Sequence, residues 1–181
     1  MNTFNDLVKD QWCYGGKKYA STATKESTDI LVDDYGFNWL LGTLNKYIYR
    51  YKNLGREKDL LKIACYCFIM WLKFGFHVSS YGTVSDNYTT VESKAKFWDK
   101  FIADINESKI PVESLGYDKS TLLMAVVKEL LDLRTRANIT STRLTIIYKT
   151  VKAIWILDEH DKKEVHDCDT WLEGNSHGKK T

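Results

Sequence analysis

The residues from Phe37 to Phe76 constrain the fold most, because they read as two helices joined by one tight turn. In the first helix, large apolar residues recur every three or four positions, the period of one buried helix face: Phe37, Leu40, Leu41, Leu44, Ile48 and Tyr51. Gly55 is suited to a left-handed C-cap that ends this helix. The second helix, over about residues 57–74, is apolar nearly all round, which is typical of a central position. So short a connection makes the two helices antiparallel neighbours.

Amphipathic spacing predicts further helices on both sides of this hairpin. We expect a short helix over residues 2–12, ended by Gly15-Gly16, and a helical segment from about Thr28 that breaks at Gly36. After a long loop, residues 75–88, three more apolar faces follow, in residues 91–105, 122–133 and 144–155. The sequence therefore predicts an all-α fold, a compact bundle of about five to six helices with a central antiparallel helical hairpin.

Length and composition fit one domain. The chain has 181 residues, of which 44% are hydrophobic and 28% are charged, enough for a proper core. Pro111 is the single proline, and no low-complexity linker divides the chain. We expect residues 1–158 to form a single helical domain and residues 159–181 to form an acidic, polar and partly disordered tail.

Several classes of function are disfavoured by the same composition. The formal net charge of +2 is too small to argue for a nucleic-acid binder. The longest apolar run, near residues 63–72, is too short to span a bilayer, and the N-terminus lacks the pattern of a signal peptide. The four cysteines show neither zinc-binding spacing nor a disulfide framework. These features predict a cytoplasmic protein with no membrane partner.

The polar side of the first hairpin helix carries the residues best suited to an anionic ligand. Lys46 and Arg50 are four residues apart and are therefore neighbours on one helix face. A nucleotide needs cations for its phosphates, an amide for its base or ribose, and an aromatic plane for its ring. A glycine on this face would also permit close backbone approach. The predicted ligand-binding residues are Trp39, Gly42, Lys46, Arg50, Asn53, Arg56 and Lys62.

Two further residues are predicted to act in catalysis. Asp59 would orient a cation or hold a magnesium ion that bridges phosphates. His77, which opens the long loop, would act as an acid or base near neutral pH and cover the site. The sequence does not identify a complete set of metal ligands. On spacing alone the commoner arrangement is a solvated helix face, with Asp59 in a salt bridge to a nearby cation.

A run of residues in the hairpin also forms a motif with three successive parts. The motif is close to G-N-x-x-K-Y-x-x-R, followed by a glycine/lysine turn and then by D-L-x-K-A-x-x-Y. The matching residues are Gly42, Lys46, Tyr47, Arg50, Asp59, Leu60, Lys62, Ala64 or Cys65, and Tyr66. The run resembles a small phage-encoded family described as nucleotide-kinase-like. The resemblance covers about thirty residues, and Thr43 stands where the family usually has Asn. It implies a phage protein of the host cytoplasm that handles deoxynucleotides, specifically a deoxynucleoside monophosphate kinase.

The chain has no G-x-x-x-x-G-K-[ST] loop, so any phosphoryl transfer by such a kinase must rest on positioning, cations and magnesium.

Two other functions stay open. An all-α magnesium-dependent nucleotide pyrophosphatase would instead use carboxylates three or four residues apart on helices. Such carboxylates occur in two sets, Glu26, Asp29 and Asp33, and Glu129 and Asp132.

The third interpretation is a non-enzymatic helical binder. Such a protein would sequester a signalling nucleotide or inhibit a host protein, and its many aromatic residues suit an interface. The predicted partner is thus a nucleotide or another phosphorylated small molecule, with a homo-oligomer or a host protein as the macromolecular alternatives.

Overall fold

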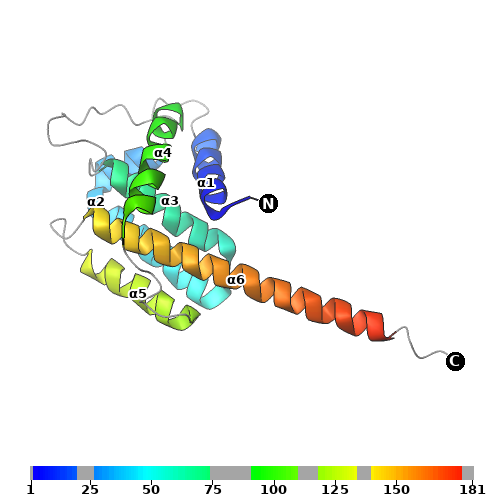
Figure 1. Cartoon of the computed structure of the whole chain (residues 1–181). Helices are drawn as coiled ribbons and strands as arrows, with labels where there is room; N and C mark the ends of the chain where they lie inside the picture. Colours follow the sequence, from blue (N-terminus) through cyan, green and yellow to red (C-terminus); the bar gives the residue numbers. More distant parts are fainter. Residues whose placement is uncertain (1, 20–26, 74–90, 110–117, 134–139, 177–181) are drawn as a thin grey trace.

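The computed structural model describes residues 2–19, 27–73, 91–109, 118–133 and 140–176. In these ranges the regular structure is entirely helical (Figure 1). The elements are α1 (Phe4–Tyr19), α2 (Ser27–Leu54), α3 (Glu57–Lys73), α4 (Val91–Glu107), α5 (Lys119–Asp132) and α6 (Ser141–Ser176). The prediction of an all-α bundle of about five to six helices is therefore confirmed. None of the described helices combines the length and the apolar character needed to cross a membrane.

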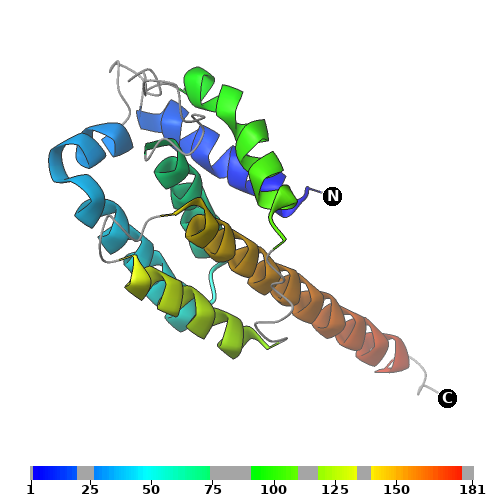
Figure 2. The same cartoon turned by 60° about the vertical axis from the view of Figure 1, so that its left-hand side comes forward.

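Helix α3 occupies the middle of the bundle, in contact with α1, α2, α4 and α6 (Figure 2). Twelve of its residues are buried, as its nearly uniform apolar composition predicts. The Phe68 ring lies within 5.4 Å of the rings of Trp12, Trp98 and Phe101, measured between centroids. Large rings from two other helices, α1 and α4, thus pack against this one helix.

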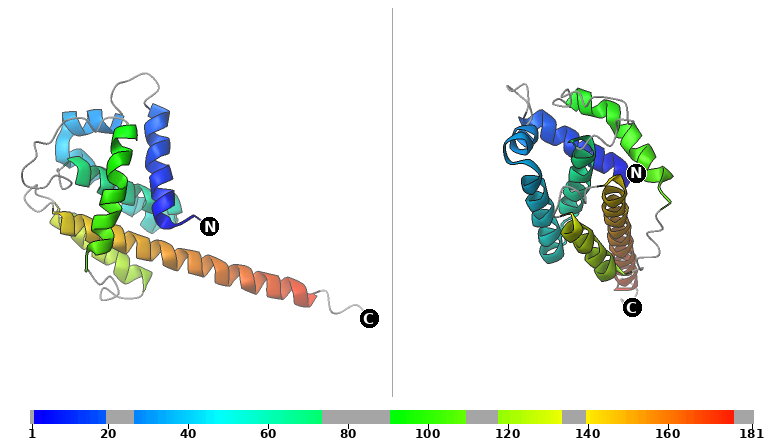
Figure 3. Two further views of the ribbon diagram at one scale, coloured as in Figure 1. Left: turned by 45° about the horizontal axis from the view of Figure 1, so that its top comes forward. Right: turned by 90° about the vertical axis from the view of Figure 1, so that its left-hand side faces the viewer.

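Helix α3 runs back alongside the second half of α2 (Figure 3). Gly55 lies in the connection with a φ of 58°, and its N–H donates to the Tyr51 carbonyl at 2.8 Å. This is the left-handed cap predicted from the sequence. Within α2, Gly36 has a φ of 64° and a ψ of −151°, so the helix bends there as expected. The bend turns the first part of α2 across the top of the bundle (Figure 3).

The N-terminal helix is longer than predicted. We expected Gly15-Gly16 to end it, but α1 continues through both glycines to Tyr19. A glycine in a helix costs only about 1 kcal/mol relative to alanine. Packing of Phe4, Val8 and Trp12 into the core outweighs that cost.

The C-terminal segment is helical over most of its length. Residues 159–176, expected as part of an acidic, polar and partly disordered tail, continue α6 as helix to Ser176. This part of α6, called here the α6 extension, leaves the body of the bundle and projects outward (Figure 1). No glycine or proline interrupts residues 141–173, so nothing in the chain stops the helix earlier. Residues 177–181 lie outside the described part.

Candidate functional site

A cavity of about 230 Å³ lies between α1, α2, α3 and α4, and we call it the aromatic cavity. Five rings line it, from Trp12, Trp39, Tyr47, Tyr66 and Phe68. Two lysines line it as well, Lys62 from α3 and Lys94 from α4. The cavity therefore combines aromatic rings with cationic groups in its wall.

Three of the rings form one continuous wall. The Tyr66 ring lies 5.9 Å from the Trp39 ring at an interplanar angle of 70°, and 5.9 Å from the Tyr47 ring at 22°. Trp39 and Tyr47 come from α2, whereas Tyr66 comes from the facing side of α3. Pairs of this geometry hold each ring in place, because edge-to-face and offset-stacked contacts are the favoured arrangements of aromatic side chains.

The charged groups of the cavity are of one sign. Lys94 is only 2% exposed, and Lys62 is partly buried. Among the described residues that line the cavity, none is an aspartate or glutamate. Lys62 has no ion-pair partner within the described part of the chain. Lys62 therefore presents positive charge to any ligand that enters the cavity.

Two other groups at the cavity have defined chemistry. Trp12 lines the cavity, and its buried indole N–H meets no acceptor among the described residues. The Cys65 thiol lies 3.5 Å from the Val8 carbonyl, to which it donates. Burial raises the pKa of Cys65 to about 12, against a small opposing effect of Lys62. Because the thiolate is the nucleophile, this cysteine is inert at neutral pH.

The structure brings part of the predicted site to this cavity. Trp39 and Lys62 line it directly. Lys46 and Arg50 lie beside it, because both contact Tyr47: Lys46 Nζ is 4.6 Å and Arg50 Cζ is 5.7 Å from the centre of that ring. Tyr47 therefore links the predicted pair of cations to the cavity.

Arg50 and Asp59 form an ion pair. Arg50 Nε is 3.3 Å from Asp59 Oδ1, and the Asp59 side chain is only 2% exposed. The positive N-terminus of α3 also favours this carboxylate, which lies in the first turn. The observed pair matches the salt-bridged alternative for Asp59. Asp59 Oδ2 is buried and has no hydrogen-bond partner among the described residues.

The remaining predicted residues are not gathered at the cavity. Gly42, Asn53 and Arg56 are exposed, and Asn53 Nδ2 donates to the Tyr49 carbonyl at 2.9 Å. A Cβ atom added at Gly42 would meet no atom of the described chain within 4 Å, so packing does not require a glycine there. His77 and the loop over residues 75–88 lie outside the described residues.

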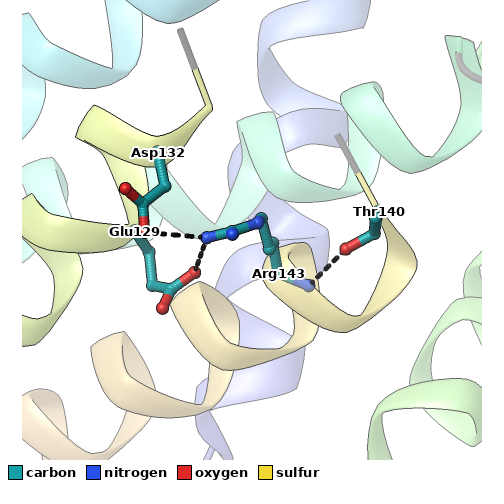
Figure 4. A network of polar contacts seen from close by, with 4 residues as sticks. All are labelled: Glu129, Asp132, Thr140 and Arg143. Atoms are coloured by element: carbon teal, nitrogen blue, oxygen red, sulfur yellow. Dashed lines mark hydrogen bonds and ion pairs between the residues drawn. The ribbon is translucent and has the colours of Figure 1, made fainter. Parts of the chain in front are cut away.

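The carboxylates considered for a pyrophosphatase have other partners. Glu129 and Asp132 both accept from Nη1 of Arg143, at 2.9 and 3.0 Å (Figure 4). Asp33 pairs with Lys73 at 3.9 Å. Glu26 and the side chain of Asp29 lie outside the described part of the chain. Within that part, no group of three or more His, Cys, Asp or Glu residues is placed to hold a metal ion.

Spacing along the chain missed most of this cavity. Trp12 and Lys94 come from α1 and α4, far from the hairpin in sequence, and no local pattern joins them to Trp39 or Lys62. Tyr47 and Tyr66 do stand in the run of residues that resembles the phage motif, and that resemblance was the signal available for them.

Comparisons of the chain with protein-family models, with curated proteins and with solved structures found no match. The resemblance to the phage family therefore rests on the residues between Gly42 and Tyr66 alone. A function has to be argued from the geometry of the site.

Proposed function

We propose that this protein binds a small anionic ligand that carries a planar ring, a nucleotide in the first instance, in the aromatic cavity. The observation that carries the proposal is the meeting of Lys62 and Lys94 with Trp39, Tyr47 and Tyr66 in one cavity. The rings supply flat apolar surfaces for a base, and the lysines supply charge for a phosphate.

The size of the cavity limits the ligand. Pockets for drug-sized ligands usually enclose about 300–1,000 Å³, and this cavity of about 230 Å³ lies just below that range. It suits one base or a single nucleotide rather than a dinucleotide. Lys46, beside the Tyr47 ring, is close enough to the cavity wall to attract a phosphate that extends from it.

The resemblance supplies the finer form of this proposal, a phage deoxynucleoside monophosphate kinase that uses magnesium. Sequestration of a nucleotide without catalysis is the second candidate, and the state of Asp59 favours it. The carboxylate proposed to recruit magnesium is only 2% exposed and is paired with Arg50, whereas magnesium usually keeps several of its waters and needs an accessible carboxylate.

Thermal melts with a panel of nucleotides, each with and without magnesium, test the proposal. A ligand at 100 times its dissociation constant stabilises the folded state by about 2.7 kcal/mol. We expect one class of nucleotide to raise the melting temperature and Lys62→Gln to abolish that rise without changing the melting temperature of the free protein. Lys128→Gln, at an exposed position on α5, is the matched control and should respond like the wild type. A panel without any shift, or an unchanged response in Lys62→Gln, would contradict the proposal.

Catalysis is then separated from sequestration by recovering the ligand. The protein is incubated with the bound nucleotide, magnesium and a nucleoside triphosphate as phosphoryl donor, and the nucleotides are separated by chromatography. A phosphorylated product supports the kinase. Unchanged ligand supports sequestration.

A further inference from the structure

A second concave surface lies on the other side of α2, between α2 and α5. Two adjoining hollows of about 450 and 370 Å³ share Lys52 and Leu123, and we call them together the α2–α5 groove. One end is apolar, where Ile48, Leu123 and Val127 form the floor. Met124 and Tyr49 stand at its side, 64% and 69% exposed. Large apolar side chains exposed side by side mark an interaction surface more often than isolated ones do.

The other end of the α2–α5 groove is basic. Lys52, Lys119 and Lys162 line it together with Asp158. Lys119 pairs with Asp158, and Lys162 pairs with Glu159 at 2.6 Å, whereas Lys52 has no ion-pair partner in the described part of the chain. The groove therefore fits an acidic segment that also carries apolar residues.

The α6 extension has that composition. Residues 159–176 contain six acidic residues and two lysines, a net charge of −4 with histidine neutral. They also contain Val165, Cys168 and Leu172, at intervals of three and four residues, the spacing of one helix face, and Trp171. A lone helix of 18 residues is of marginal stability in water, so an extension that projects from the bundle gains from a partner surface.

Beyond Lys162, the extension does not turn back into the groove of its own chain. It continues α6 outward from the bundle, and turning back would require the helix to break (Figures 1 and 3). Asp158 and Lys162, at the base of the extension, themselves line the basic end of the groove. A second copy whose extension runs back along this base would thus enter the groove at its basic end. An extension of 18 residues is about 27 Å long at 1.5 Å per residue, enough to lie along both hollows.

We propose that the α6 extension of a second copy docks in the α2–α5 groove, with its apolar residues against Met124 and Tyr49 and its carboxylates near Lys52. In a two-fold symmetric dimer each copy offers one extension and one groove, so the two contacts are equivalent and the assembly is closed.

Light scattering during size-exclusion chromatography of the full chain tests the dimer. The expected mass is twice the 21.0 kDa of one chain. Met124→Glu places a charge in the groove, and Leu172→Glu places one on the extension; each should elute as a monomer. Tyr35→Ser removes an equally exposed aromatic residue elsewhere on α2 and should remain dimeric. Circular dichroism melts establish that every variant is folded.

Mixing the two monomeric variants gives the decisive result. The mixture contains one intact groove and one intact extension, so it should form a heterodimer through one contact, at higher concentrations than the wild type needs. A monomeric wild type would overturn the proposal, as would a mixture that stays monomeric at one hundred times the concentration at which the wild type dimerises. A dimeric Met124→Glu beside a monomeric Leu172→Glu would overturn it too, since the extensions would then pair with each other.

Discussion

Helices α3 and α6 pack against each other, yet they are buried to very different extents. In α3 the side chains from Asp59 to Leu72 are almost all buried, on every side of the helix. In α6 Ile154 is the last buried residue among those whose burial is described, and the helix then continues to Ser176. The same kind of backbone thus serves as a core in one case and as a projecting arm in the other.

The different burial of α3 and α6 shows that amino-acid composition, rather than helical propensity, decides how far burial extends along a helix. The first half of α6 presents a stripe of large apolar residues with no exposed surface: Leu144, Ile147, Tyr148, Val151 and Ile154. Beyond Asp158 charged residues interrupt that stripe, and the helix projects from the bundle (Figure 1). The hydrogen bond from Trp155 Nε1 to Glu57 Oε1, at 2.7 Å, joins the two helices near this transition.

The largest expected effect concerns the cysteine of α3 that lines the aromatic cavity. Burial raises the pKa of Cys65 from its ordinary value of 9.0 to about 12, which lowers its thiolate fraction at pH 8 about 10³-fold. We expect iodoacetamide to leave Cys65 unmodified in the native protein while the half-buried Cys13 reacts, as read by mass spectrometry. The folded state holds the proton more tightly than the unfolded state. The free energy of unfolding should therefore fall as the pH rises above about 9. Rapid labelling of Cys65 in the native protein would show that α3 opens easily. It would contradict the contrast between α3 as a core helix and α6 as a projecting one.

The next effect is the loss of a core ring. Phe68→Ala in α3 should lower the free energy of unfolding by about 3–5 kcal/mol, because the cavity left among Trp12, Trp98 and Phe101 cannot close. Ile156→Ala in α6, at a position 51% exposed, is the matched change and should stay within about 0.5 kcal/mol. Urea denaturation followed by circular dichroism measures both. Equal losses would contradict the contrast between the helices.

A smaller effect separates the ion pairs of the two helices. Arg50→Ala leaves the buried carboxylate of Asp59 without its cation, and we expect a loss of about 1–3 kcal/mol because the partly exposed guanidinium is screened by solvent. Lys162→Ala removes the exposed pair with Glu159 on α6 and should cost less than about 1 kcal/mol. Both are measured by urea denaturation at low and at 1 M salt, where only the α6 pair should lose its contribution. If Arg50→Ala does not change the free energy of unfolding, the ion pair with Asp59 does not stabilise the fold. Arg50 would then be available to bind a ligand, as its predicted role requires.

The smallest effect tests the contact between the helices themselves. Glu57→Ala removes the acceptor of the Trp155 indole and should cost about 0.5–1.5 kcal/mol. Glu57→Gln keeps an acceptor oxygen and should cost less. Tryptophan fluorescence follows the environment of the indole, and denaturation gives the free energy. If both variants behave like the wild type, this hydrogen bond does not help to join α3 to α6.

The helices predicted most accurately from the sequence were those whose burial shows in local spacing. The period of Leu40, Leu44 and Ile48 and the cap at Gly55 located the end of α2, and the apolar circumference of α3 predicted its burial. Gly15-Gly16 and the acidic stretch after Asp158 misled us for different reasons. The two glycines disfavour a helix only weakly, and the packing of α1 decided the outcome there. The acidic stretch disfavours burial but contains no stop signal, so the helix of α6 continues.

The candidate site was predicted less well than the fold. Spacing placed Lys46 and Arg50 on one face, but it could not tell that Asp59 would be buried against Arg50. Nor could it bring Trp12 and Lys94 to Trp39, because that meeting depends on how α1 and α4 pack on α3. Contacts between distant segments of the chain cannot be predicted from the spacing of residues within either segment.

The connection of two residues between α2 and α3 has a consequence for the order of folding. Closing so short a loop costs little chain entropy, and the contacts that follow lie close in sequence. Helix α6 must meet α3 across the 67 residues between Lys73 and Ser141, so closing that loop costs more chain entropy and the encounter is slower. We expect the α2–α3 pair to act as the nucleus on which the later helices condense.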